Sequence, residues 1–159
     1  MNPADWAIWL EASPLGGWMR TSAFAYPAVN LLHVLGLVLL LGAMLLLDLR
    51  LLGVGRRLPM PEVSALLTPL AAAGLLILLG TGALLFAADA APLLRNPLFI
   101  PKMACIALGV VNAIAFRFLW AGRLARWDST PPLRARLQAG ASLLLWVAAA
   151  CLGRLLAYM

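Results

Sequence analysis

Charged residues are scarce in this chain. Only 11% of its 159 residues are Asp, Glu, Lys or Arg, whereas a soluble domain carries about 25%. Cysteine is also rare, and two residues cannot build a disulfide-rich scaffold. Apolar residues make up 64% of the sequence, which is more than one core of a chain this short can bury. The composition excludes a disordered chain and a nucleic-acid-binding domain, and it indicates an integral membrane protein in a lipid bilayer.

Four long apolar runs occupy most of the chain. Each exceeds the roughly 20 residues that a helix needs to cross the hydrocarbon core. Their continuous Leu- and Ala-rich composition favours helices over the alternating strands of a barrel. We therefore predict an all-α membrane protein with four transmembrane helices in one bundle, forming a single domain over residues 1–159. The expected spans are residues 24–52, 63–88, 98–120 and 137–158.

The segment of residues 1–20 precedes the first span. Its indoles, including those of Trp6, Trp9 and Trp18, predict a short amphipathic helix that lies at the level of the lipid headgroups. The segment has no basic start followed by an apolar core, so we predict no cleaved leader.

Basic residues are distributed unequally between the connections. The first and third loops hold eight arginines, whereas the opposite side holds four basic residues. Because cytoplasmic loops carry the excess of Lys and Arg, we expect both termini on the outside. In a bacterial inner membrane this is the periplasmic side. The eight loop arginines are Arg50, Arg56, Arg57, Arg117, Arg123, Arg126, Arg134 and Arg136.

Few polar residues interrupt the spans, and such residues mark candidate functional sites because they are costly in a membrane unless paired. On a helical wheel, Asn30, His33 and Asp48 share one face of the first span, which should point into the bundle. The polar residues of the third span, Lys102 and Asn112, also share one face.

Depth divides these residues into two groups. Counting from the expected boundaries places one group in the outer half of the bundle: His33, Asn30, Thr81, Lys102 and Arg154. At the cytoplasmic end, Asp48 and Arg117 should form a structural ion pair. The thiols of Cys105 and Cys151 are expected to be buried as small apolar groups.

His33 is the only histidine of the chain. A neutral imidazole inside a helical bundle is a standard axial ligand of haem iron. One interpretation is therefore a haem site whose propionates are bound by Lys102 and Arg154. Asn30, Thr81 and Asn112 would support these groups. The alternative is that His33 only forms a hydrogen bond across the bundle, to Thr81 or Asn112.

A haem with two axial ligands would need a second one in addition to His33. Within the chain, the candidates are Met44, Met103 and Lys102. A second protomer in a homo-oligomer could instead contribute its own His33.

The first span resembles the opening helix of a group of small bacterial four-helix membrane proteins. This group includes the HemJ-type protoporphyrinogen oxidases and the CopD-type copper-resistance proteins. The resemblance rests on residues 30–36, with sequence Asn-Leu-Leu-His-Val-Leu-Gly, and on residues 47–50. The segment around Lys102 is similar to the start of a later helix in the oxidases. Residues 81–86 and Gly153-Arg154 match uncharacterised members.

This resemblance implies haem b on His33, with Lys102 essential nearby. Three functions remain open from the sequence. The first is a haem-binding redox protein that exchanges electrons with a quinone or acts on a tetrapyrrole. The second is a non-catalytic accessory or scaffold subunit of a larger membrane complex. The third is copper handling through His33 and methionines. The sequence leaves undecided whether the protein is an enzyme.

Overall fold

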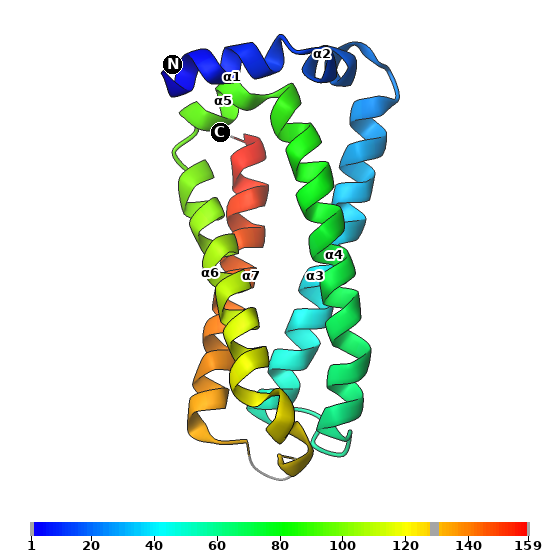
Figure 1. Cartoon of the computed structure of the whole chain (residues 1–159), viewed down its shortest axis with the longest axis vertical. Coiled ribbons are helices and arrows are strands. Elements are labelled where there is room, and N and C mark those ends of the chain that lie inside the picture. Colours follow the sequence, from blue (N-terminus) through cyan, green and yellow to red (C-terminus); the bar gives the residue numbers. More distant parts are fainter. Residues whose placement is uncertain (1, 128–130, 159) are drawn as a thin grey trace.

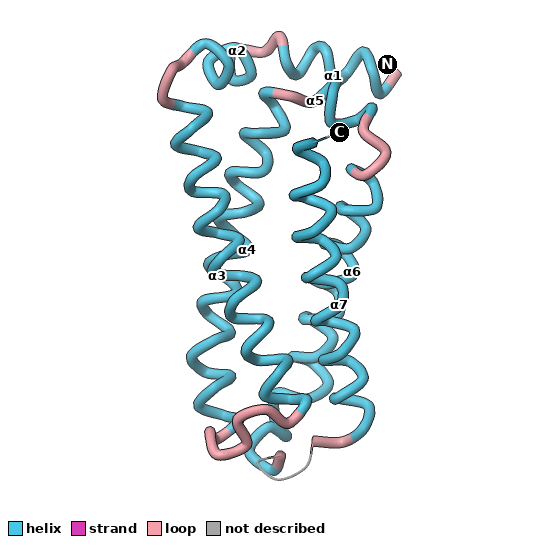
Figure 2. The backbone as a smooth tube through the Cα atoms, turned by 180° about the vertical axis from the view of Figure 1, so that it is seen from behind, coloured by secondary structure: helices cyan, strands magenta, loops and turns pink. Residues whose placement is uncertain are grey.

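The structure, a computed structural model, describes residues 2–127 and 131–158. Every regular element in these two stretches is a helix, and long helices stand side by side beneath a layer of short ones (Figures 1 and 2). The elements are α1 (Pro3–Glu11), α2 (Pro14–Thr21), α3 (Ala25–Leu52), α4 (Met60–Ala88), α5 (Ala90–Arg95), α6 (Phe99–Trp120), η1 (Ala121–Arg126), α7 (Leu133–Leu155) and η2 (Leu156–Tyr158).

Four of these helices are long and apolar enough to cross a membrane: α3, α4, α6, and α7 together with η2. The predicted all-α fold with four transmembrane helices is therefore confirmed. The four spans end at the predicted residues, and their starts differ from the predicted ones by one to four residues. The largest difference is in the fourth span, which begins at Leu133 rather than at residue 137, because Pro132 ends the loop and the charged residues after it already adopt the helix.

The short helices α1, α2 and α5 lie across one end of the bundle, which we call the capped end (Figure 1). The predicted interfacial segment is two helices, because Ser13 caps α2 by accepting the N–H of Gly16 at 3.2 Å. Arg20 ties α2 to the end of α4 by donating to the carbonyl of Ala88 at 2.9 Å. The carboxylate of Glu11 in turn accepts the N–H of Ala91 at 2.7 Å.

The four long helices pack as two pairs. Helices α3 and α4 form one pair, α6 and α7 form the other, and α7 also packs on α3. The closest approach within the first pair is at Gly36 and Gly74: a methyl group built on Gly74 would lie only 2.5 Å from the backbone nitrogen of Leu40. Small residues at such a crossing allow two backbones to approach closely.

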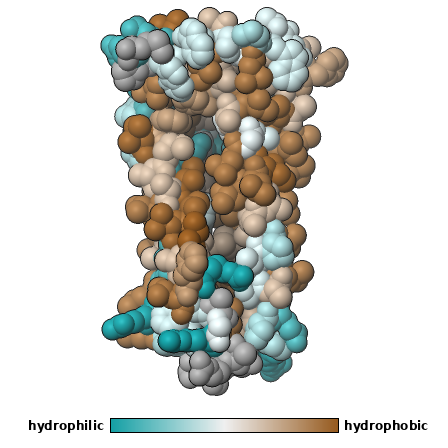
Figure 3. Space-filling view, in the orientation of Figure 1, coloured by the Kyte–Doolittle hydropathy of each residue, from teal (hydrophilic) through white to brown (hydrophobic). Residues whose placement is uncertain are grey.

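Helices α4 and α6 make at most marginal contact within the described residues. The bundle is consequently open on this side, and Figure 3 shows a lengthwise groove between the two pairs with hydrophilic atoms inside it. The main apolar core lies towards the other end of the bundle, the loop end, where α3 and α7 meet. It includes Leu40, Met44, Leu51, Phe116 and Trp146.

Neither thiol belongs to this core. Cys105 is half-buried, but Cys151 is exposed on the surface of α7. The expectation of two buried thiols was therefore wrong for Cys151, which faces the bilayer as a small apolar group.

Candidate functional site

The imidazole of His33 is held in one orientation by α4. Its Nδ1 lies 2.8 Å from the hydroxyl of Thr81, which is itself buried. That hydroxyl donates its only hydrogen to the carbonyl of Ile77 at 2.6 Å, so it can only accept from the imidazole. Nδ1 therefore carries the proton in the neutral ring. Nε2 keeps a lone pair and has no hydrogen-bond partner among the residues that the structure describes.

Lys102 approaches the same place from α6. Its ammonium is close enough to the imidazole of His33 for an electrostatic interaction. The side chain lies against Gly153 of α7, where an added methyl group would be 3.4 Å from Cε and 3.7 Å from Nζ. In residues 2–127 and 131–158, this ammonium has neither a hydrogen bond nor an ion pair.

A second glycine flanks the imidazole. A methyl group built on Gly82 of α4 would lie 3.5 Å from Cε1 of His33, so the ring has a residue without a side chain beside it. Each of the four long helices thus contributes at least one residue to this site. The contributing residues are His33, Thr81, Gly82, Lys102 and Gly153, and we call them the His–Lys site.

Arg154 does not join the His–Lys site. It follows Gly153 directly, and consecutive residues of a helix point about 100° apart, so it faces away when Gly153 faces Lys102. The guanidinium is exposed and binds Tyr158 of η2, donating to the hydroxyl and lying 4.6 Å from the ring centroid. Asn30 is likewise exposed, at the edge of the face that carries His33.

Asn112 lies in the loop half of the bundle, ten residues or about 15 Å beyond Lys102 along α6. Its amide donates to the carbonyl of Gln138 at 3.2 Å, and the amide of Gln138 donates to the carbonyl of Asn112 at 3.1 Å. Gln138 also accepts the indole N–H of Trp120 at 2.9 Å. Asn112 therefore joins α6 to α7. Sequence reasoning missed its partner, Gln138, because an amide near a helix start gives no distinct signal.

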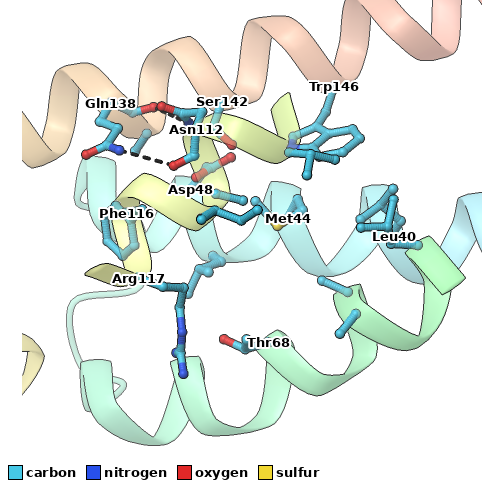
Figure 4. A pocket seen from close by; sticks show the side chains of 18 of the residues that line it. Leu40, Met44, Asp48, Thr68, Asn112, Phe116, Arg117, Gln138, Ser142 and Trp146 are labelled. Carbon is cyan, nitrogen blue, oxygen red and sulfur yellow. Dashed lines mark hydrogen bonds between the residues drawn. The ribbon is translucent and has the colours of Figure 1, made fainter. Parts of the chain in front are cut away.

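The expected ion pair between Asp48 and Arg117 is not formed. Asp48 is buried and faces Ser142 of α7. Arg117 is exposed and points away from Asp48 towards α4 (Figure 4). This correction has a physical reason, since Arg117 lies near the end of α6 and its long side chain can carry the charge out of the apolar layer.

The structure also shows which candidates for a second axial ligand lie close to His33. Met44 lies eleven residues, or about 16 Å, from His33 along α3. Met103 is 45% exposed on α6. Of the three side chains considered within the chain, only Lys102 lies at the His–Lys site. Across the described stretches, no three His, Cys, Asp or Glu side chains are grouped to hold a metal ion together.

The fold and the site together define a four-helix membrane protein with an oriented imidazole and an ammonium between its helices. The chain belongs to DUF6644, a family of unknown function, whose profile matches residues 6–159. Comparison with curated proteins and with solved structures finds no match.

Proposed function

We propose that this protein is a membrane redox protein that binds haem b at the His–Lys site. Nε2 of His33 would be the axial ligand, and the ammonium of Lys102 would bind a propionate. One observation carries the proposal: a fixed imidazole with an open Nε2 lies near an ammonium that has no partner in the described chain. An unpaired charge in an apolar span is costly, and a ligand carboxylate would compensate it.

The imidazole has the features of a metal ligand. Histidines that bind metals almost always donate their other ring N–H to a protein group, as His33 does to Thr81. A single histidine suffices for haem, because the porphyrin supplies the equatorial ligands of the iron. Gly82 and Gly153 place no side chain of their own against the two key side chains. When bound, the haem supplies one-electron transfer, and the protein binds and orients it.

The resemblance to the HemJ-type and CopD-type group supports the same proposal, since it also points to His33 and Lys102. We further propose a bacterial inner membrane as the location, with the capped end in the periplasm. The connections that follow α3 and α6 lie at the loop end (Figure 1), and these connections together with the adjoining helix ends carry most of the arginines. A quinone or a tetrapyrrole would be the redox partner.

An absorption spectrum of the purified protein tests this proposal. After expression in haem-replete cells, we expect a Soret band in the wild type and its loss in His33→Gln. Met103→Leu is a matched control, because this neighbour of Lys102 is exposed and should leave the band unchanged. A folded wild type without a Soret band would overturn the proposal.

Two further measurements on the same sample separate the alternatives. Copper in place of iron in a metal analysis would favour copper handling. A colourless protein that co-purifies with a stoichiometric partner would favour an accessory subunit.

A further inference from the structure

A cavity of about 210 Å³ lies in the loop half of the bundle. All four long helices contribute to its wall, as the close-up in Figure 4 shows. His33 and Lys102 do not line it, so it is distinct from the His–Lys site.

Three polar side chains in the wall of this cavity are incompletely satisfied. Asp48, Ser142 and Trp146 are 3%, 2% and 5% exposed. Oδ2 of Asp48, Oγ of Ser142 and Nε1 of Trp146 have no hydrogen bond of normal geometry, although the hydroxyl of Ser142 faces the carboxylate of Asp48. Buried polar atoms are rarely left without partners. Because the indole can only donate and the unpartnered Oδ2 of Asp48 can accept, a suitable ligand carries both an acceptor and a donor.

The rest of the wall is largely apolar. The volume of the cavity is about seven times the roughly 30 Å³ that one water occupies in the liquid, so one or two waters that bridge the polar atoms would not fill it. Phe116 and Trp146 add two aromatic rings, which favour an aromatic occupant. The wall therefore suits a mainly apolar molecule with a small polar end.

The cavity opens towards the membrane between α4 and α6, the two helices that hardly touch. Its lining residues on this side include Ala72 of α4 and Ile114 and Arg117 of α6, all of which are exposed. A ligand would thus enter laterally from the bilayer, which requires it to be soluble in lipid.

We propose that this cavity binds the head ring of a membrane quinol, that is, a hydroxylated aromatic ring on an apolar tail. A ring hydroxyl would donate to Asp48, and a ring oxygen would accept the N–H of Trp146. The tail would leave between α4 and α6. This site does not depend on haem at His33, and it can be tested separately.

The test uses the full-length protein in lipid nanodiscs and a benzoquinol with a ten-carbon tail, kept reduced without oxygen. The corresponding quinone and decanol are the comparison ligands, and equilibrium dialysis gives each dissociation constant. We expect saturable binding of the quinol, roughly tenfold tighter than that of the quinone, which lacks a donor for Asp48. Trp146→Phe keeps the ring and removes the N–H, and it should weaken quinol binding about two- to tenfold.

A second pair of variants tests the location without touching the polar end. Ala72→Phe should block the mouth and abolish quinol binding. Ala73→Phe is the matched control, because Ala73 is also exposed on α4 but does not line the cavity. The proposal is overturned if decanol or the quinone binds as tightly as the quinol. It also fails if only water fills the cavity and no ligand saturates, or if Ala72→Phe and Ala73→Phe bind alike.

Discussion

At the scale of single residues, the hydroxyl of Thr81 sets the chemistry of His33. It donates its hydrogen to the carbonyl of Ile77, so it can only accept a hydrogen bond from Nδ1. This arrangement fixes both the tautomer and the direction of the open Nε2. The role of Thr81 is to position His33, and removing its hydroxyl should affect any ligand bound at Nε2.

Thr81→Val keeps the shape of the side chain and removes the hydroxyl. We expect the affinity for haem b to fall about 10- to 100-fold, the usual cost of losing a group that orients a metal ligand. Titration of the haem-free protein, followed in the Soret region, measures this change. Thr81→Ser restores the hydroxyl and should recover most of the affinity. Equal affinity in Thr81→Val and the wild type would show that the hydrogen bond has no such role.

The sequence could predict part of the site at this scale. Helical periodicity and depth correctly brought His33, Thr81 and Lys102 to the same half of the bundle. They could not predict the partners of Asn112 and Arg154, because a helical wheel gives the direction of a side chain but not its partner. Arg154 binds Tyr158 of the adjoining η2, and Asn112 binds Gln138 of α7. The contact of Arg154 depends on the local geometry of the chain, and that of Asn112 depends on the relative register of α6 and α7.

At the scale of elements, the crossing of α3 and α4 sets the register of these two helices at the His–Lys site. Gly36 and Gly74 bring the two backbones together, and His33 and Thr81 lie within two turns of this crossing. The close approach is what allows the imidazole of one helix to reach a hydroxyl of the other. A side chain at the crossing should therefore disturb the site as well as the packing.

Gly74→Ala tests this dependence. Its methyl group would lie 2.5 Å from the nitrogen of Leu40 and 2.8 Å from the carbonyl oxygen of Gly36, which are backbone atoms and cannot move alone. We expect a destabilisation of about 1–3 kcal/mol, typical of overpacking, measured from the unfolding of the protein in detergent. Gly80→Ala on the same helix has no atom within 4 Å of the new methyl group and should be neutral or slightly stabilising. Equal stability of the two variants would argue against a tight crossing.

The long helices could be predicted from the sequence because length and hydropathy alone define a span. The short helix α5 could not. It consists of Ala90–Arg95, has Pro92 near its start, and lies in what composition indicates is a loop. It is held by tertiary contacts with α1, including the bond from the N–H of Ala91 to Glu11. Six residues do not form a stable helix without such contacts.

At the scale of the whole molecule, charge and packing distinguish the two ends of the bundle. The loop end carries most of the arginines and the main apolar core. The capped end carries the short helices (Figure 2). The His–Lys site is nearer to this end, because Lys102 lies near the start of α6 and Gly153 near the end of α7. If the excess of positive charge lies in the cytoplasm, the His–Lys site belongs to the outer half of the membrane.

Labelling with a membrane-impermeant maleimide tests this orientation. The positions chosen are Ala12, between α1 and α2, and Val54, after α3, both of which are exposed. In a background with Cys105 and Cys151 replaced by Ala, we expect Ala12→Cys to react in intact cells. Val54→Cys should react only after the cells are disrupted. The reverse pattern would place the His–Lys site on the cytoplasmic side.

The most direct test of the account is a titration of the haem-free protein with haem b and with its dimethyl ester, which has no free propionate. We predict that wild type binds the ester roughly tenfold more weakly than haem b, because Lys102 then lacks a carboxylate partner. In Lys102→Gln this difference should largely disappear, and in His33→Gln neither ligand should give the spectrum of an imidazole-bound iron. Equal binding of both ligands by wild type, or an unchanged spectrum in His33→Gln, would contradict the assignment of these two residues to one haem site.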